Sequence, residues 1–487
     1  MDAGTTAQVA AVLGALGAAL VLTAARRALL LAGLALVAAA EVAFGLDLVP
    51  SAGLDLLLRP SGAAGAAAGL LVLGAAAAVL VRAPALVAPI ALVVAPLRLP
   101  LEIGSENRFL VGVAEAGRLG RLHLLYLVIA AGTVALAVRA LRGESMPAPP
   151  RVIAIPAAAF LVVASLSLLW SDDPAATANR LAFFLVPFAV LVAVVSRSPF
   201  ASWTPRALAA TLVGLVTVFA GVGLWQAWSK ELLFYAPNLE IANAYTSFFR
   251  VTSLFTDPSL YGRHVILGIG VLLVLLLHRR IQSLVALALI VFLWAGLYVS
   301  YSQSSLAALF VVVAALGLVA AGRRTRVLVA AAVAVVALGA AGSLALAAED
   351  ESARRLTSGR SRLVDITWQV FREHPLAGVG LGAQPLASRE AVGPGAPVAR
   401  YTSHTTPLTV GAELGVLGLG AYLALLVGAA SALLAVWRRH ATLGLSLAAV
   451  FVALVVHSLA YSGFYEDPLT WGVLAVASSF LASRAPA

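Results

Sequence analysis

Long apolar runs alternate with short polar connections from one end of this chain to the other. Many runs reach about 20 residues, the length that an α-helix needs to cross the hydrocarbon core of a bilayer. The pattern therefore predicts an all-α polytopic integral membrane protein with about 12–15 transmembrane helices. The predicted spans are residues 6–24, 28–48, 62–81, 84–100, 121–138, 152–170, 178–196, 206–227, 261–278, 281–299, 304–321, 326–347, 406–436, 441–463 and 467–483.

The positions of the basic residues indicate how these helices are oriented. Arginines occur in alternate connections, and cytoplasmic loops carry the excess of Lys and Arg in membrane proteins. We therefore expect a multi-pass protein of the cytoplasmic (inner or plasma) membrane, with its N-terminus outside and its C-terminus inside. The basic connections contain Arg26/Arg27, Arg82, Arg139/Arg142/Arg151, Arg197/Arg206, Arg279/Arg280, Arg323/Arg324/Arg326 and Arg438/Arg439.

Composition narrows the classes of function. Of the 487 residues, 62% are hydrophobic and 11% are charged, so the chain is far from the composition of a soluble domain. The net charge of +10 comes largely from the loop arginines, and we interpret it as a topology signal rather than a nucleic-acid surface. The chain has no cysteine, which excludes disulfides, thiolate metal sites and cysteine nucleophiles. No basic region precedes the first apolar run, which predicts a retained helix rather than a cleaved signal peptide.

The chain divides into four predicted regions. Residues 1–150 form N-terminal transmembrane helices, and residues 151–347 form core helices with an outward loop at 228–260. Residues 348–405 form a large extracytoplasmic loop, and residues 406–487 form the C-terminal transmembrane helices. The large loop contains seven arginines against six acidic residues, although it lies on the side where the topology rule disfavours them. It is either a functional element or a solvated, roughly neutral connection.

An amphipathic helix is predicted inside the large loop. Its apolar stripe has i, i+3, i+4, i+7, i+8 spacing and consists of Leu363, Ile366, Thr367, Val370 and Phe371. Pro375 ends the helix, and the following "GVGLG" is expected to be a flexible turn. Such a helix is expected to lie on the outer membrane surface, with its apolar face against the bilayer.

Three outward positions collect residues that suit phosphate chemistry. They are Arg250 and Asp257 beside a helix start, Arg360 and Arg362 on the amphipathic helix, and His404 and Glu413 at the start of the span that follows. A guanidinium binds phosphate oxygens bidentately and keeps its charge. A histidine near neutrality can accept a proton from a hydroxyl. Together these residue types predict a site for a lipid-linked phosphate donor and a hydroxyl nucleophile.

Each candidate also has a structural interpretation. Arg263 and His264 are consistent with an ordinary helix start at the lipid headgroups, and His404 with an interfacial histidine. Glu413 lies within a span, where it either pairs with a buried arginine or acts in function. The adjacent carboxylates of "WSDDP" (170–174) allow a divalent metal, but a helix-ending turn explains them more simply. No metal ligand set is predicted.

Several short motifs, in this order, resemble the O-antigen ligase and O-antigen polymerase superfamily of bacterial envelope glycosyltransferases. They are "SLLWSDDPAA", "RVTSLFTDPSLYG", "GRSRLVDITWQVFREHPLAGVGLG" and "SHTTPLTVGAELGVLGL", within roughly residues 155–480. Arg360 falls on an arginine of the family's external loop and His404 on its histidine. The sequence departs from the family in "SYSQSSLAAL", where Gln303 stands at a position that is often arginine.

The resemblance implies a GT-C-like, metal-independent and inverting membrane glycosyltransferase that needs no cofactor. Such an enzyme transfers glycan from undecaprenyl pyrophosphate to an acceptor hydroxyl on the outer face of the membrane, in polysaccharide biosynthesis of the cell envelope. By the same resemblance, Arg360 and His404 are catalytic, Arg250, Arg360, Arg362 and Gln303 bind the donor pyrophosphate, and Glu413 and Asp257 support them. Its partners are the lipid-linked donor, a glycan, lipid or protein acceptor, and membrane lipids, with no nucleic acid.

Two other functions are compatible with the predicted topology. A flippase or other transporter of lipid-linked saccharide is expected to place charges near the midplane, often in repeated halves. A non-catalytic membrane scaffold explains the helices but not the arginines and histidine at the outward helix ends. A structure in which Arg250, Arg360 and His404 line one outward cavity would favour the enzyme, and a scattered placement would favour the transporter or the scaffold.

Overall fold

The computed structural model describes residues 4–48, 59–97, 122–234, 237–320, 360–393, 398–461 and 463–483, and these residues contain helices and no strand. Eleven of the helices are long and apolar enough to cross a membrane, which confirms the predicted all-α polytopic fold. They are α1 (Thr5–Thr23), α2 (Arg27–Leu48), α4 (Pro60–Arg82), α6 (His123–Leu141), α7 with η2 (Arg151–Trp170), α8 with η3 and α9 (Pro174–Ser196), α10 (Thr204–Ser229), α12 (Pro258–Leu277), α14 (Gln303–Ala320), α19 (Thr406–Arg439) and α20 (Ala441–Ser458).

Shorter helices complete the described part of the chain. Three of them are apolar, namely η1 with α5 (Pro84–Val94), α13 (Ser283–Tyr298) and α21 (Pro468–Ala482). Four others lie between spans, namely α11 (Pro237–Tyr245), α17 (Arg360–Glu373), α18 (Gln384–Val392) and η4 (Val398–Tyr401). Helices predominate because backbone N–H and C=O groups in hydrocarbon have no water to bind. The predicted span 326–347 lies outside the described residues.

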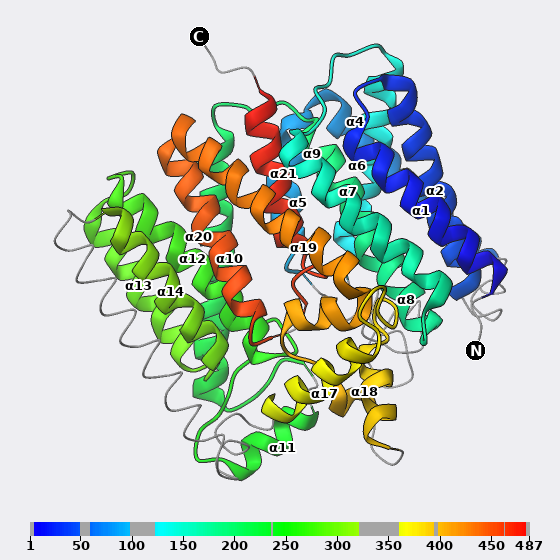
Figure 1. Cartoon of the computed structure of the whole chain (residues 1–487). Helices are drawn as coiled ribbons and strands as arrows, with labels where there is room; N and C mark the ends of the chain where they lie inside the picture. Colours follow the sequence, from blue (N-terminus) through cyan, green and yellow to red (C-terminus); the bar gives the residue numbers. More distant parts are fainter. Residues whose placement is uncertain are drawn as a thin grey trace.

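The helices form two groups joined by α19 and α21 (Figure 1). In one group, α12 packs against α10, α13, α14 and α20. In the other, α1 packs against α2, α7 and α9. The long helix α19 contacts α7 on one side and α20 on the other, and α21 packs against α9. Residues of both groups therefore meet along α19 and α21.

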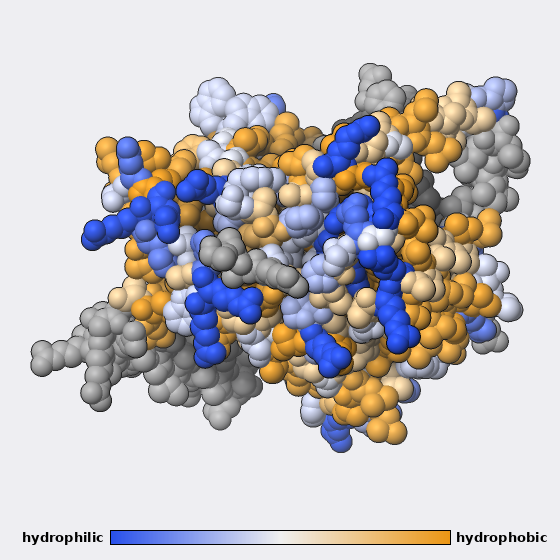
Figure 2. Space-filling model, turned by 90° about the horizontal axis from the view of Figure 1, so that it is seen from above, coloured by the Kyte–Doolittle hydropathy of each residue, from blue (hydrophilic) through white to orange (hydrophobic). Residues whose placement is uncertain are grey.

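The two ends of the bundle differ in character. The N-terminus, α11, α17 and α18 lie at one end and the C-terminus at the other (Figure 1). The connections that carry the basic residues lie at the C-terminal end, whose face shows clusters of hydrophilic side chains (Figure 2). Among the described residues, the exposed arginines at this end are Arg26, Arg27, Arg82, Arg142, Arg151, Arg206, Arg279, Arg280, Arg438 and Arg439. The described arginines of the alternate connections therefore lie together at one end of the fold.

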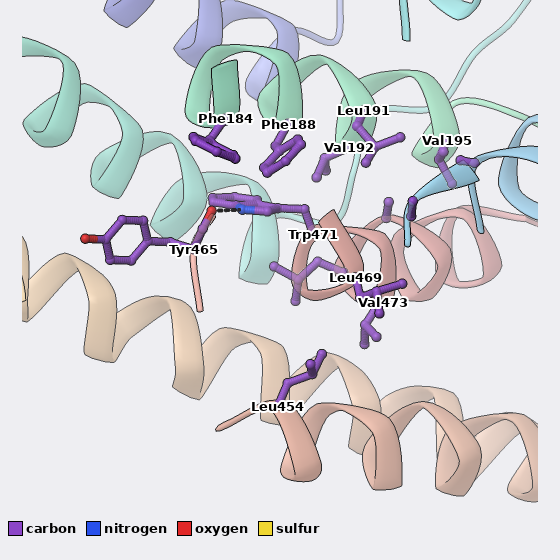
Figure 3. Close-up of a cluster of buried hydrophobic side chains, with 14 of the residues drawn as sticks. Phe184, Phe188, Leu191, Val192, Val195, Leu454, Tyr465, Leu469, Trp471 and Val473 are labelled. Carbon is purple, nitrogen blue, oxygen red and sulfur yellow. Dashed lines mark hydrogen bonds between the residues drawn. The ribbon is translucent and has the colours of Figure 1, made fainter. Parts of the chain in front are cut away.

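A buried tryptophan joins α21 to the middle of the bundle. Trp471 is fully buried and packs near Phe184 and Phe188, as Figure 3 shows. Its indole N–H donates a 2.8 Å hydrogen bond to the carbonyl oxygen of Tyr465. A buried indole requires such an acceptor, and the bond holds the turn before α21 in place. That turn carries charged residues of the site described below.

The predicted amphipathic helix exists, but its apolar stripe does not face the bilayer. In α17, Ile366, Thr367 and Val370 are buried, and the helix packs against α18 and α19. Val370 forms a small core with Val379, Ala383 and Ala412. The prediction of a helix lying flat on lipid was therefore wrong. The physical reason is that neighbouring segments offer an apolar protein surface, which periodicity alone does not distinguish from lipid.

Candidate active site

The segment that carries Arg250 is fixed by hydrogen bonds to its backbone. Asn243 binds Arg250 from both directions, accepting from its N–H at 2.9 Å and donating to its carbonyl oxygen at 3.0 Å. The fully buried Gln226 of α10 accepts from the N–H groups of Thr252 (3.1 Å) and Ser253 (2.6 Å). Asp257 accepts from two N–H groups in the first turn of α12 and so caps that helix. This contact is structural, and the predicted supporting role of Asp257 at the donor site stays a prediction.

The side chain of Arg250 reaches the turn before α14. Its Nε donates to the carbonyl oxygen of Ser300 at 3.5 Å. Ser302 accepts from the N–H of Ser305 at 3.3 Å and thereby caps α14, while Tyr301 has a positive φ of 49°. Gln303 is the exposed first residue of α14. Arg250 and Gln303, which lie 53 positions apart in the sequence, are thus attached to the same turn.

His404 belongs to a chain of polar and aromatic side chains that ends at the same turn. Its ring lies 6.5 Å from that of Tyr461, measured between centroids, and the Tyr461 ring lies 5.3 Å from that of His457. His457 is fully buried at the end of α20, and its Nε2 lies 3.3 Å from Oγ of Ser304. Ser304 follows Gln303 directly. The fold therefore connects the predicted histidine to the segment that also holds Arg250.

The "GVGLG" segment fills a break in α19. Gly415 has non-helical angles (φ 63°, ψ −164°), so the carbonyls of residues 412 and 413 lose their usual i+4 amide partners. The segment after α17 donates to these two carbonyls and accepts from the two released amides, those of Val416 and Leu417. The shorter bonds are Val379 N to Ala412 O (3.0 Å), Gly380 N to Glu413 O (2.8 Å) and Val416 N to Pro375 O (2.8 Å). Such irregular backbone is tolerated inside a membrane protein when it is buried in protein.

This docking contradicts the prediction of a flexible turn. A Cβ on Gly378 would overlap backbone atoms of Glu413, and the residue has a φ of +69°. Both the left-handed conformation and the close approach require glycine. The glycines thus bring the part of the large loop that follows α17 directly onto the helix that follows His404.

Glu413 lies at the break and takes part in a buried ion-pair network. Nη1 of Arg180 donates to its two carboxylate oxygens at 3.1 and 3.2 Å, and the Tyr465 hydroxyl donates to Oε2 at 3.0 Å. Arg180 also pairs with Glu466 at 3.1 Å. Burial, and after it the Glu413 carboxylate, raises the pKa of Tyr465 well above 10.0, so the hydroxyl stays protonated and remains a donor. Glu413 thus has the arginine partner that its structural interpretation required.

A second buried pair lies in the same turn. Nη2 of Arg263 lies 2.6 Å from Oδ2 of Asp467, and both side chains are almost completely buried. Asp467 also caps α21 through a 2.8 Å bond from the N–H of Leu469. Neighbouring acids of one turn, Glu466 and Asp467, therefore bind arginines from two different helices. Arg263 therefore forms a buried ion pair and does not simply mark the start of a helix at the lipid headgroups.

The remaining predicted residues have different surroundings. Arg362 is exposed on α17. Arg360 begins α17, but its side chain lies outside the described residues. Asp173 of "WSDDP" caps α8 by accepting from the N–H of Ala176 at 3.0 Å, as the turn interpretation predicted. In the described part of the chain, no group of three or more His, Cys, Asp or Glu residues is placed to hold a metal ion.

Sequence reasoning missed Arg180, Tyr465 and Tyr461 as parts of the site region. Arg180 did give a signal, because it is a charge inside a predicted span, and such residues are candidates for buried pairs. A π-helical segment, Leu181–Leu185, follows it directly, and such segments often occur at functional sites. The tyrosines gave none, because Tyr is common at membrane interfaces.

Part of the chain matches a known protein family. Residues 288–423 match the family described as O-antigen ligase. The matched region contains Gln303, α17, the docked glycine segment, His404 and Glu413, whereas Arg250 and Asp257 precede it. None of the curated proteins matches the chain.

Proposed function

We propose that this chain, a member of the O-antigen ligase superfamily through its domain at residues 288–423, transfers glycan from an undecaprenyl-pyrophosphate-linked donor to an acceptor hydroxyl. The reaction takes place at the outer face of the cytoplasmic membrane and builds a cell-surface polysaccharide. The match to the O-antigen ligase family supports the two classes of substrate, a lipid-linked glycan donor and an acceptor. The assignment of the outer face rests on the positions of the charges.

Charge distribution supports an outward-facing site. The basic connections occupy the C-terminal end of the bundle, which the positive-inside rule assigns to the cytoplasm (Figure 1). The turn at Ser300, the start of α17 and His404 belong to segments at the opposite end. Donor and acceptor therefore meet on the side where an envelope polysaccharide is assembled.

The proposed step is a displacement at the anomeric carbon of the donor sugar. The acceptor oxygen forms the new bond to this carbon as the bond to the pyrophosphate oxygen breaks, which inverts the configuration. The bonding electrons leave with the pyrophosphate, and the acceptor hydroxyl loses its proton to His404. A positioned general base of this kind contributes about 10²–10⁴-fold to a rate.

Arginines neutralise the leaving group in this mechanism. Arg250 is suited to this role because Asn243 and Gln226 fix the backbone of its segment, and its Nε donates to the carbonyl oxygen of Ser300, so that the guanidinium is held at the turn before α14. Arg360 and Arg362, at the start of α17, add positive charge, and Gln303 offers hydrogen bonds to the phosphates. Preorganised donors at a developing charge are usually the largest catalytic contribution.

One observation carries the proposal. Segments around residues 250, 300–305, 404 and 457–461 are distant in sequence, but hydrogen bonds and ring contacts connect them at one end of the bundle. A scaffold has no need to connect an arginine and a histidine through a single turn. A transporter is expected to concentrate its charges near the midplane.

The test uses His404→Ala and Arg250→Gln in the native host, with Arg372→Gln as the matched control. Arg372 is an exposed arginine of the large loop. It lies in the last turn of α17, away from the start of that helix. We expect both site variants to accumulate outward-facing undecaprenyl-pyrophosphate-linked glycan and to lose or shorten the surface polysaccharide. The rate should fall by about 10²–10³-fold for Arg250→Gln. The control should resemble the unaltered protein.

Protein amounts in the membrane must be equal for the comparison. Accumulation of donor on the inner face would identify a flippase instead. Normal pools on both faces, with normal surface polysaccharide, would contradict the transferase and favour a scaffold. In vitro transfer by the purified His404→Ala variant at the unaltered rate would exclude the proposed base.

A further inference from the structure

The bundle contains a large cavity that the proposed transfer reaction does not use. It has a volume of about 850 Å³ and lies between α5, α9, α10, α12, α20 and α21. Its walls are mainly aliphatic. They include Leu191 and Val195 of α9 and Leu469 and Val473 of α21, which are labelled in Figure 3. Such a wall accommodates hydrocarbon and offers little to a sugar or a nucleotide.

The mouth of the cavity is strongly basic. Arg206, Arg279, Arg280 and His440 line it, and none of the described residues lining the cavity is Asp or Glu. No ion pair joins any of the three arginines to a carboxylate in the described part of the chain. The N-terminal ends of α10 and α20, at Thr204 and Ala441, lie beside them. Helix N-termini carry partial positive charge, which adds to that of Arg206 in the first turn of α10, whereas Arg279 and Arg280 follow the C-terminus of α12. An anion at the mouth compensates the charge of the three arginines and accepts from the amides at the start of α10.

The cavity is separate from the candidate active site. Along α12 its lining runs from Leu267 to Arg279 just beyond the helix end, a length of about 18 Å at the rise of an α-helix. This length is close to the ~15 Å of hydrocarbon in one leaflet. Arg206, Arg279, Arg280 and His440 at the mouth belong to the connections at the C-terminal end of the bundle, whereas Ser300 and His404 precede α14 and α19 at the other end. The cavity therefore belongs to the leaflet on the cytoplasmic side of the proposed topology.

We propose that this cavity binds an anionic phospholipid of the bilayer. The acyl chains occupy the aliphatic part, and the phosphate lies between Arg279, Arg280 and Arg206 at the ends of α10 and α20. Charge and shape select this occupant together, because a zwitterionic lipid compensates less of the positive charge and a soluble phosphate leaves the hydrocarbon space unfilled. A polyprenyl phosphate also presents a phosphate, but its chain is much longer than a one-leaflet cavity holds.

Two variants distinguish the contribution of the basic mouth to lipid binding from that of the apolar walls. Arg279→Gln combined with Arg280→Gln removes charge at the mouth. Gly472→Leu adds a side chain to the wall, where a Cβ meets no atom within 4 Å, and it replaces a helical glycine by a better helix former. Arg142→Gln is the matched control, because Arg142 is exposed at the same end but does not line the cavity.

The experiment measures lipid retention by the full-length protein with native mass spectrometry and by lipid-dependent melting temperature. The probes are phosphatidylglycerol, phosphatidylcholine, glycerol phosphate and a polyprenyl phosphate. We expect the unaltered protein and Arg142→Gln to retain phosphatidylglycerol in preference to phosphatidylcholine. The double arginine variant should bind it roughly 30-fold more weakly. Gly472→Leu should lose it while the lipid-free protein melts as before.

Equal binding of the two phospholipids, or unchanged binding in both variants, would overturn the proposal. Glycerol phosphate binding as tightly as the lipid would show that the apolar walls contribute nothing and would also overturn it. Displacement of phosphatidylglycerol by an equimolar polyprenyl phosphate would replace the proposed occupant. The measurement follows binding and not transfer, so its outcome is independent of the proposed reaction.

Discussion

Removal of Arg180 tests whether the buried ion-pair network stabilises the fold. Arg180 pairs with Glu413 from α19 and with Glu466 from the turn before α21. The side chain of Glu413 has no solvent exposure, whereas that of Glu466 is 24% exposed. Arg180→Gln therefore leaves one carboxylate uncompensated in the interior and a second one close to it.

The expected cost follows from this burial. Breaking a buried ion pair by removing one partner destabilises a protein by about 3–5 kcal/mol. Glu413→Gln should cost less than Arg180→Gln, because Arg180 keeps Glu466 as a partner. The double variant should cost less than the sum of the two single variants, since the second substitution removes the charge that the first one leaves unpaired.

The assay is reversible unfolding of the purified protein in mixed micelles by SDS titration, followed by circular dichroism. The two single variants, the double variant and the unaltered protein form a double-mutant cycle, with Tyr465→Phe as a milder change in the same network. A loss below about 0.5 kcal/mol for Arg180→Gln would refute the argument. Additivity of the two single variants within about 0.5 kcal/mol would show that the pair does not couple.

Three further predictions concern backbone contacts and topology. Gly378→Ala should abolish the accumulation of folded protein, measured by fluorescence-detected size exclusion, because the new Cβ overlaps the broken part of α19, whereas Gly420→Ala, with open space at its Cβ, should fold normally. Gln226→Ala removes the acceptor of two buried amides and should cost about 1–3 kcal/mol for each, with reduced transfer; unchanged unfolding and transfer would contradict this. Because the chain has no cysteine, Arg362→Cys should react with an impermeant maleimide from outside and Arg142→Cys only after permeabilisation, and the reverse pattern would invert the topology.

The fold class and the spans could be predicted from the sequence because both depend on local properties. A span requires about 20 apolar residues and internal backbone hydrogen bonds, whatever its neighbours are. The loop arginines report orientation in the same local way. The stripe of α17 was also visible, since periodicity is a property of one helix.

Pairing between distant segments depended on tertiary structure. Glu413 was recognisable as an ionisable residue in a span, but its partner Arg180 lies 233 positions away, and no local pattern connects the two. Likewise, the chain His404–Tyr461–His457–Ser304 joins segments whose composition is typical of any membrane interface. Only the packing of α19 between the two groups of helices decides which of these segments come into contact.

The clearest difference between the sequence-based prediction and the structure is the surface that covers the apolar stripe of α17. The sequence by itself determined that α17 is amphipathic and that "GVGLG" follows its end. It did not determine that the stripe packs on α18 and α19, or that the glycines fill a break at Gly415. Lipid and protein present similar apolar surfaces. The spacing of apolar residues in a helix therefore does not reveal which of the two will cover its apolar stripe. The segment after α17 packs against protein because the break in α19 leaves backbone groups without partners. Lipid cannot form hydrogen bonds to these groups, and the docked loop does.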